Sequence, residues 1–266
     1  MEYNIIKVRE GHFLVRALLL VVFHFSLITM YAQVGQYRSE LAVGVNGGYV
    51  MNKVSFTPEV PQLYQGGITG GLTLRYTSEK LFSSICAITA EVNYAQMGWK
   101  ENILDLSDNP VYYSDDPDKT DPLYYERRIN YIQIPIMARM GWGRERRGFQ
   151  GFLQLGPQIA FYQNESTNTN VIKGKATQNK RASGIVAQED MPVEKKFDYG
   201  IAAGLGLEFS HRKLGHFLLE GRYYYGLGDI YGNSKSDYFG RSNFGQIVIK
   251  ASYLFDLVRT KNDKIK

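Results

Sequence analysis

After residue 40, an alternation of apolar and polar residues recurs eight times along this chain. Over residues 131–140, an apolar residue occupies every second position, and tyrosine, glutamine, proline and arginine fill most positions between. Successive side chains of a strand point to opposite faces, so each run predicts a strand with one apolar face. The runs lie within residues 41–49, 68–76, 88–99, 131–140, 149–161, 197–209, 217–227 and 247–255.

The length of these runs points to a membrane. Each has about 9–13 residues, whereas strands of soluble sheets are nearer 5–6 residues and a tilted strand needs about 9–11 to cross a bilayer. The connections 77–84, 141–148 and 211–215 are short, and 50–67, 100–128, 163–196 and 228–243 are long. Outer-membrane barrels place short turns in the periplasm and long loops outside. We therefore predict an all-β, eight-stranded antiparallel transmembrane up-and-down β-barrel with both termini on the periplasmic side.

Charged residues in mid-strand indicate which face is inside. Both signs occur on the polar faces of neighbouring runs, where they can form ion pairs across a narrow lumen and offset the cost of burial. Aromatic residues near the ends of the apolar faces resemble the girdles at membrane interfaces. The alternative is a soluble barrel whose apolar face points inward. We predict a structural lumen ion-pair network made of Arg75, Glu91, Arg139, Glu208, Glu220, Arg222 and Lys250.

The first 32 residues predict a secretory signal peptide. Three basic residues precede an apolar run of about 14 residues, and the small residue Ala32 follows it. This run is short for a spanning helix, which needs about 17–25 residues; the alternative is an uncleaved anchor. We expect a signal peptide over 1–32, an outer-membrane β-barrel over 33–258 and a short basic tail over 259–266.

Charge and cysteine content exclude several classes of function. The net charge is +5 with 31 Lys and Arg, but these form no sustained run, so the basic patch typical of nucleic-acid binding is missing. The single cysteine, Cys86, rules out an intramolecular disulfide and is expected to be a packed thiol.

The sequence predicts no catalytic, cofactor-binding or metal site. Two of the four histidines lie in the predicted signal peptide, and His211 and His216 flank a predicted periplasmic turn, where we expect surface residues. The long loops thus lack the histidine that a serine or aspartate nucleophile needs. Glu208 and Glu220 are interpreted as members of the ion-pair network rather than a general acid–base pair. The Gly-x-Gly pattern at 204–206 lies within a strand and is not a phosphate-binding loop.

Two long loops carry opposite charge. Residues 105–121 contain six aspartates, whose spacing does not match an EF-hand. Residues 173–196 contain six lysines and arginines. We expect the loops to meet electrostatically outside the membrane. The arginines at 144, 146 and 147 are interpreted as an ordinary charged turn, with acidic periplasmic partners as the alternative.

Four segments resemble a known family. The tyrosine–aliphatic–polar–isoleucine–proline pattern at 131–136, the glycine-rich strand 197–208 ending in glutamate, and the segments 222–230 and 247–255 together resemble the PorT-like outer-membrane β-barrel family of Bacteroidota. The resemblance covers roughly residues 40–257. It implies an eight-stranded outer-membrane barrel but no single activity, and the family takes its name from a member needed for protein secretion.

These observations favour a non-enzymatic outer-membrane protein that anchors and displays loops, or serves as an accessory subunit of an envelope complex. The alternatives are a component required for protein export, a small pore or transporter, and a lipid- or peptide-modifying enzyme. The expected partners are outer-membrane lipid and envelope or secretion-complex proteins, with no nucleic acid, no small-molecule substrate and no cofactor.

Overall fold

The computed structural model describes residues 36–81, 83–144, 146–182, 187–232 and 238–261. The predicted signal peptide and the last five residues of the predicted tail lie outside this part of the chain. Within it, no helix is long and apolar enough to span a membrane.

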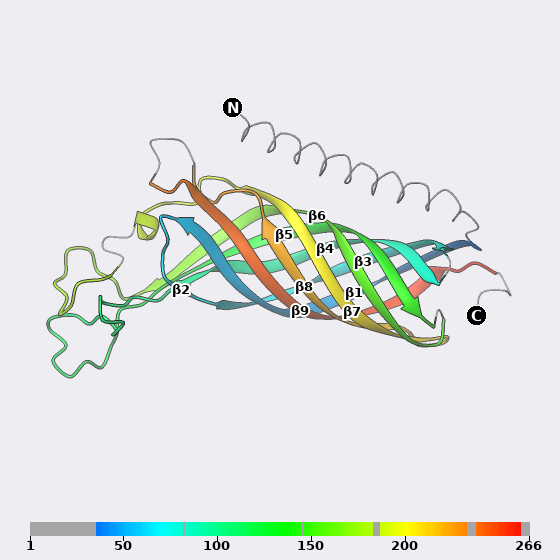
Figure 1. Cartoon of the computed structure of the whole chain (residues 1–266), viewed down its shortest axis with the longest axis horizontal. Helices are drawn as coiled ribbons and strands as arrows, with labels where there is room; N and C mark the ends of the chain where they lie inside the picture. The colour runs from blue at the N-terminus through cyan, green and yellow to red at the C-terminus, as the bar shows by residue number, and fades with distance from the viewer. Residues whose placement is uncertain (1–35, 82, 145, 183–186, 233–237, 262–266) are drawn as a thin grey trace, which may run out of the picture.

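The described residues form nine strands in one sheet that closes on itself (Figure 1). Eight are long, each antiparallel to its neighbours, and the pairings of β4 with β5 and of β1 with β9 complete the ring. This confirms the predicted antiparallel up-and-down barrel. The strands are β1 (Gln36–Thr57), the two-residue β2 (Gln62–Leu63), β3 (Gln65–Leu81), β4 (Ser84–Glu101), β5 (Tyr125–Gly143), β6 (Gly148–Thr169), β7 (Phe197–His211), β8 (Gly215–Gly226) and β9 (Arg241–Val258), with one 3₁₀ turn, η1 (Ala187–Glu189).

Some strands run further than the alternation predicted. Residues 125–128 and 163–169, expected as loop, continue β5 and β6 and pair from Tyr125↔Thr169 inward. These extensions are mostly polar, so they lack the apolar period from which the strands were predicted. Backbone hydrogen bonds between β5 and β6 extend the hairpin instead.

The apolar faces point outward, which excludes the soluble-barrel alternative. Leu72, Leu153 and Leu205 are 61%, 50% and 68% exposed, while polar residues at alternate positions of the same strands are buried, namely Arg75, Gln154 and Glu208. The aromatic residues at the ends of the apolar faces are also on the outside, among them Tyr49, Phe149 and Phe217. A barrel of this polarity is stable only where lipid covers its outer face.

The two ends of the barrel differ. The short turns lie at one end together with the start of β1 and the end of β9, and the long connections extend from the other end (Figure 1). In an outer-membrane barrel, the first of these ends is periplasmic and the second is outside.

We predict that the protein in isolated outer membranes migrates faster on a denaturing gel when unboiled than when boiled. Closed barrels resist detergent until they are heated, because every strand edge is paired. An identical mobility in both lanes, with the protein extracted by mild salt, would contradict the membrane barrel.

Candidate functional site

One buried charge cluster is centred on Glu208 of β7. Arg75 of β3 donates from Nη1 to Glu208 Oε2 at 2.7 Å, and Arg139 of β5 contacts the same oxygen. The Arg139 guanidinium also lies 3.8 Å from the centre of the Phe152 ring. These charged side chains are at most 8% exposed, and barrel closure brings them together from three separate strands.

A second cluster lies further along the lumen. Arg222 of β8 binds Glu91 of β4 through two parallel bonds of 3.0 and 2.9 Å. Its Nε donates to Glu220 Oε1 at 2.7 Å. Lys250 of β9 contacts Glu91, and its Nζ lies 3.3 Å from Glu220 Oε2. Gly204 leaves room for Glu220, because a Cβ at that position would lie 2.6 Å from the Glu220 Oε1 atom.

The structure thus brings all seven charged residues of the predicted network into the lumen, in these two clusters. Polar neighbours continue the second one: Asn46 Nδ2 donates to Thr73 Oγ1 and to Asn93 Oδ1, both at 2.8 Å. Each charge has at least one opposite charge in contact, which offsets the cost of its burial. The second cluster pairs two cations with two carboxylates, whereas in the first Glu208 is shared by two arginines.

The prediction for His216 was wrong. His216 is 5% exposed, and its Nδ1 lies 2.8 Å from Ser210 Oγ and 2.7 Å from Glu208 Oε1. Its Nε2 lies 3.1 Å from the Asp256 carboxylate. The turn ends before Gly215, so His216 already belongs to β8 and shares the inward face with Glu220. Applying the alternation to residue 216 would have placed it inside.

His211 is the last residue of β7 and flanks the turn as expected, and its Nδ1 accepts from the backbone N–H groups of Lys213 and Leu214 at 3.3 Å.

Ser210, His216 and Asp256 have the side-chain types of a catalytic triad, but their environment does not support catalysis. Both ring nitrogens of His216 contact carboxylates, so neither is free to take the serine proton. Ser210 is fully buried, and its Oγ also donates to Glu208 Oε1 at 2.9 Å. The described residues therefore give no positive evidence of catalysis, and none of their His, Cys, Asp or Glu side chains form a group suited to a metal ion.

The outer end of the lumen is closed by an aromatic cluster that the alternation did not predict. Trp99 and Phe239 are fully buried and flank Phe56, with ring centres 5.3 and 4.8 Å apart. Arg127 lies 5.6 Å from the Trp99 ring centre and donates to the Tyr231 hydroxyl at 3.1 Å. In this stretch of β4 and β5 the apolar residues, among them Met97 and Ile129, are on the inner face, and polar residues occupy the outer face. This reverses the pattern of the middle of the strands, so the alternation alone did not identify the inner face.

The second and third outer loops, residues 102–124 and 170–196, pack together as a unit that we term the loop head. Backbone bonds join Ser114 N to Ala176 O at 3.0 Å and Gln178 N to Tyr112 O at 2.9 Å. Lys175 Nζ lies 2.9 Å from Asp115 Oδ2. The prediction that these loops meet is confirmed, but backbone pairing contributes more bonds than the charges do.

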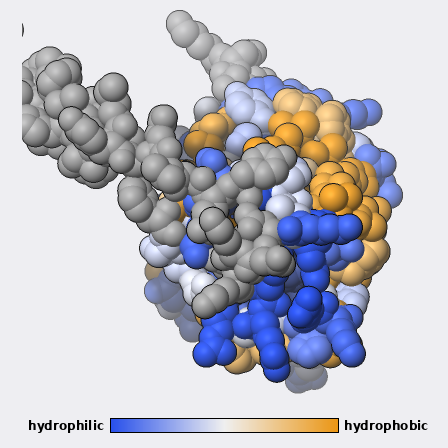
Figure 2. Space-filling model, turned by 90° about the vertical axis from the view of Figure 1, so that its right-hand side faces the viewer, coloured by the Kyte–Doolittle hydropathy of each residue, from blue (hydrophilic) through white to orange (hydrophobic). Residues whose placement is uncertain are grey.

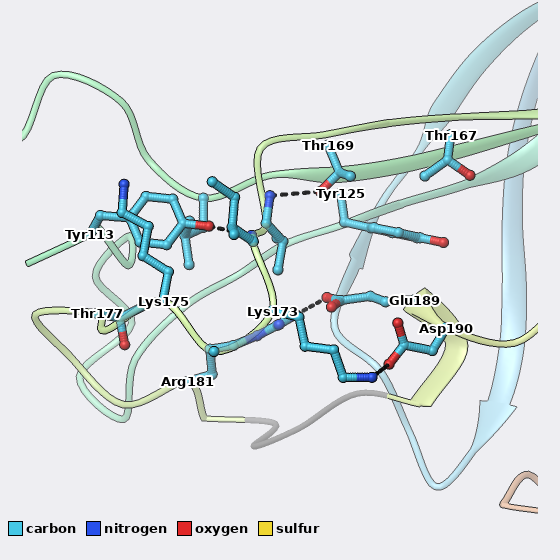
Figure 3. A pocket seen from close by; sticks show the side chains of 14 residues that line it. Tyr113, Tyr125, Thr167, Thr169, Lys173, Lys175, Thr177, Arg181, Glu189 and Asp190 are labelled. Carbon is cyan, nitrogen blue, oxygen red and sulfur yellow. Dashed lines mark hydrogen bonds and ion pairs between the residues drawn. The ribbon is translucent and has the colours of Figure 1, made fainter.

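The loop head contains a cavity of about 350 Å³ (Figure 3). Tyr113, Tyr125 and aliphatic side chains line it together with three cations, each of which has an acidic partner. Arg181 bridges Glu189 and Glu101 at 2.7 and 2.6 Å.

The other two cations of the cavity form exposed pairs. The hydrogen bond to Asp190 raises the pKa of Lys173, and the hydrogen bond from Lys175 lowers the pKa of Asp115. The charged groups around the cavity are thus electrically balanced.

Two aspartates of the second loop accept hydrogen bonds from the backbone of that loop. Asp105 accepts from the N–H groups of Ser107 and Asn109 at 2.8 and 2.9 Å. Asp116 accepts from Thr120 and Asp121, both at 3.0 Å. These turns shape the loop rather than assemble ligands for a cation.

Comparison with known proteins gives one family match. A family model described as outer membrane protein beta-barrel domain matches residues 31–232. No curated protein matches the chain.

Several solved structures resemble this one at low identity. Ail, the attachment invasion locus protein of Yersinia pestis, solved with the heparin analogue sucrose octasulfate, is 12% identical, with 81% of this chain and 99% of that chain covered and a TM-score of 0.32. Neisserial surface protein A is 10% identical, with 80% and 99% covered and a TM-score of 0.39. The outer membrane enzyme PagL is 8% identical, with 78% and 98% covered and a TM-score of 0.37. At these values we transfer no activity or ligand to this chain.

We predict that Glu91→Gln lowers the free energy of unfolding by about 3–5 kcal/mol, because it leaves the buried Arg222 and Lys250 without full compensation. The measurement is urea unfolding of the barrel in lipid vesicles. Glu59→Gln is the matched control, since Glu59 is an exposed carboxylate in the β1–β2 connection. Equal stability of the two variants would contradict a contribution of the lumen network to stability.

We also predict that Tyr113→Phe makes the loop head more sensitive to protease. The Tyr113 hydroxyl donates to Asn170 O at 2.7 Å and accepts from Ile172 N at 2.5 Å, so both bonds between the loops are lost. Tyr112→Phe is the control, because the Tyr112 hydroxyl makes no hydrogen bond within the described residues. Equal cleavage rates for the two variants would show that these bonds do not hold the loops together.

Proposed function

Because the chain belongs to the outer membrane protein beta-barrel domain family and lies in the outer membrane, we propose that it is a non-enzymatic, non-conducting barrel that anchors the loop head at the cell surface. The observation that carries this proposal is the closure of the lumen by the protein's own side chains at two levels. In such a barrel, the loops are the part that can contact other molecules outside the membrane.

The interior supports the non-conducting part of the proposal. An eight-stranded barrel has room for side chains but not for an aqueous channel. Here the aromatic cluster around Trp99 fills the outer end of the lumen, and the two ion-pair clusters fill the lumen on the periplasmic side of it. A pore would require both levels to move, which would separate Glu91 from its two cations.

The outer end supports the display part of the proposal. Loops carried on a rigid scaffold are the usual place for binding residues. The loop head is held by backbone pairing and contains a cavity, so it presents a defined surface rather than a set of independent loops.

An accessory role in a PorT-type export machine is the main alternative, and it rests on the resemblance of residues 131–136 and 197–208 to the PorT-like family of Bacteroidota. This alternative requires a stable protein partner in the envelope. Affinity purification followed by mass spectrometry, carried out on the wild-type chain and on the Tyr113→Phe variant, distinguishes the roles. A partner that binds the loop head is retained by the wild-type chain and reduced with the variant.

We predict that liposomes containing the purified protein swell in small sugars no faster than protein-free liposomes. A wide porin in the same lipid is the positive control. Swelling well above the protein-free rate would contradict a closed lumen and support the small pore or transporter.

We further predict that a cysteine at residue 118 is labelled by a membrane-impermeant maleimide in intact cells. Asp118 is exposed in the second outer loop. A cysteine at Lys213, in the β7–β8 turn, serves as the control and should react only after the outer membrane is opened; both variants carry Cys86→Ser. Labelling at 213 but not at 118 in intact cells would invert the orientation and overturn the display role.

A further inference from the structure

A second concave surface lies at the periplasmic end, on the outer wall beside the β5–β6 turn. Its volume is about 530 Å³. Phe149 and Phe209, a cross-strand pair with ring centres 5.0 Å apart, line its apolar part. Arg144, Arg147 and His211 line its polar part. We term this surface the rim pocket.

We infer that the rim pocket binds the phosphate headgroup of an anionic phospholipid in the periplasmic leaflet, with the upper part of the lipid against Phe149 and Phe209 and the phosphate at Arg144 and Arg147. This inference depends on the orientation and location of the barrel, but it does not depend on what the loop head binds.

The arginines of this turn divide into two roles. Arg146 points into the end of the barrel, where its Nε lies 3.0 Å from Glu40 Oε1 and its Nη2 donates to Thr260 O at 2.7 Å. Arg144 and Arg147 are exposed and make no ion pair within the described residues. Among the described residues, Arg146 therefore has an acidic partner, whereas Arg144 and Arg147 have none and can bind an external anion.

The geometry of the turn holds the cations at the wall. A Cβ built on Gly148 would lie 2.8 Å from Arg144 Cδ, so the stem of Arg144 folds across this glycine, close to Phe149. Because His211 Nδ1 accepts two backbone N–H groups, the hydrogen of a neutral ring is on Nε2, which can donate to a phosphate oxygen.

The position in the membrane supplies the ligand. Phe149 is 70% exposed on the lipid-facing wall and lies next to the charged turn, at the boundary where aromatic girdles meet headgroups. Figure 2 looks onto this end and shows hydrophilic residues gathered over its centre and lower part, beside hydrophobic residues on the flank. None of the described residues that line the pocket is acidic. Basic pockets at a membrane surface are the usual recognition sites for anionic headgroups.

The test is native mass spectrometry of the full mature protein released from nanodiscs that contain phosphatidylethanolamine and phosphatidylglycerol. We expect retained lipid to be enriched in phosphatidylglycerol by about threefold over the bulk ratio. Arg144→Gln/Arg147→Gln should bring the ratio back to bulk, and Arg144→Lys/Arg147→Lys should keep most of the enrichment. A heat-dependent gel shift checks that each variant is folded.

The matched control is Arg212→Gln/Lys213→Gln, which removes the same charge from the neighbouring periplasmic turn, outside the rim pocket. This control should keep the enrichment. Equal losses in the two Gln variants would show a diffuse charge effect and overturn the site, as would a wild-type protein without enrichment.

Discussion

Charges that pair inside a closed ring of strands determine how this barrel is built. Glu208 and Glu91 each receive two cations from strands that are distant in sequence, so the clusters can form only when the barrel closes. Removing one member of a buried pair costs about 3–5 kcal/mol, because the partner loses its compensation. The ions therefore favour the closed, correctly registered ring over any partly open arrangement, and they simultaneously fill the space that a channel would need.

This constraint also explains where the apolar residues lie. A strand has two faces, and when one carries arginine, lysine and glutamate in mid-strand, only the other can contact lipid. Leu72 and Leu205 are exposed for this reason, although both would be core residues in a soluble barrel. The lumen becomes largely apolar at its outer end, around Trp99, where the apolar side chains of β4 and β5 change to the inner face.

The alternation of apolar and polar residues was sufficient to predict the strands, their faces and the inward direction of all seven charged residues. Each of these follows from whether a residue occupies an odd or an even position in its strand. It could not predict partners: that Arg222 contacts Glu91 depends on which strands face each other across the ring. It also could not predict the extension of β5 and β6 over residues 125–128 and 163–169, which is due to backbone pairing alone. The prediction for His216 was wrong because its nearness to a turn was given more weight than its spacing from Glu220. The two positions differ by an even number, which places both side chains on the same face of the strand. The rim pocket lies where the β5–β6 and β7–β8 turns are neighbours; the up-and-down order predicts that the turns are neighbours but not that their side chains form a concave surface.

The two ends of the barrel differ in how their cationic side chains are paired, and this difference separates the roles of the two ends. In the loop head, Lys173, Lys175 and Arg181 each have an acidic partner, so a ligand there meets a balanced surface and would be selected by shape and hydrogen bonding. At the periplasmic rim, Arg146 pairs with Glu40, while Arg144 and Arg147 have no ion-pair partner within the described part of the chain and lie beside two exposed rings. An unpaired guanidinium at a lipid boundary gains most from a phosphate that stays in the membrane plane. The periplasmic end is therefore suited to hold the barrel at a fixed depth in the membrane. A fixed depth allows the extended β5–β6 hairpin to keep the loop head outside the bilayer.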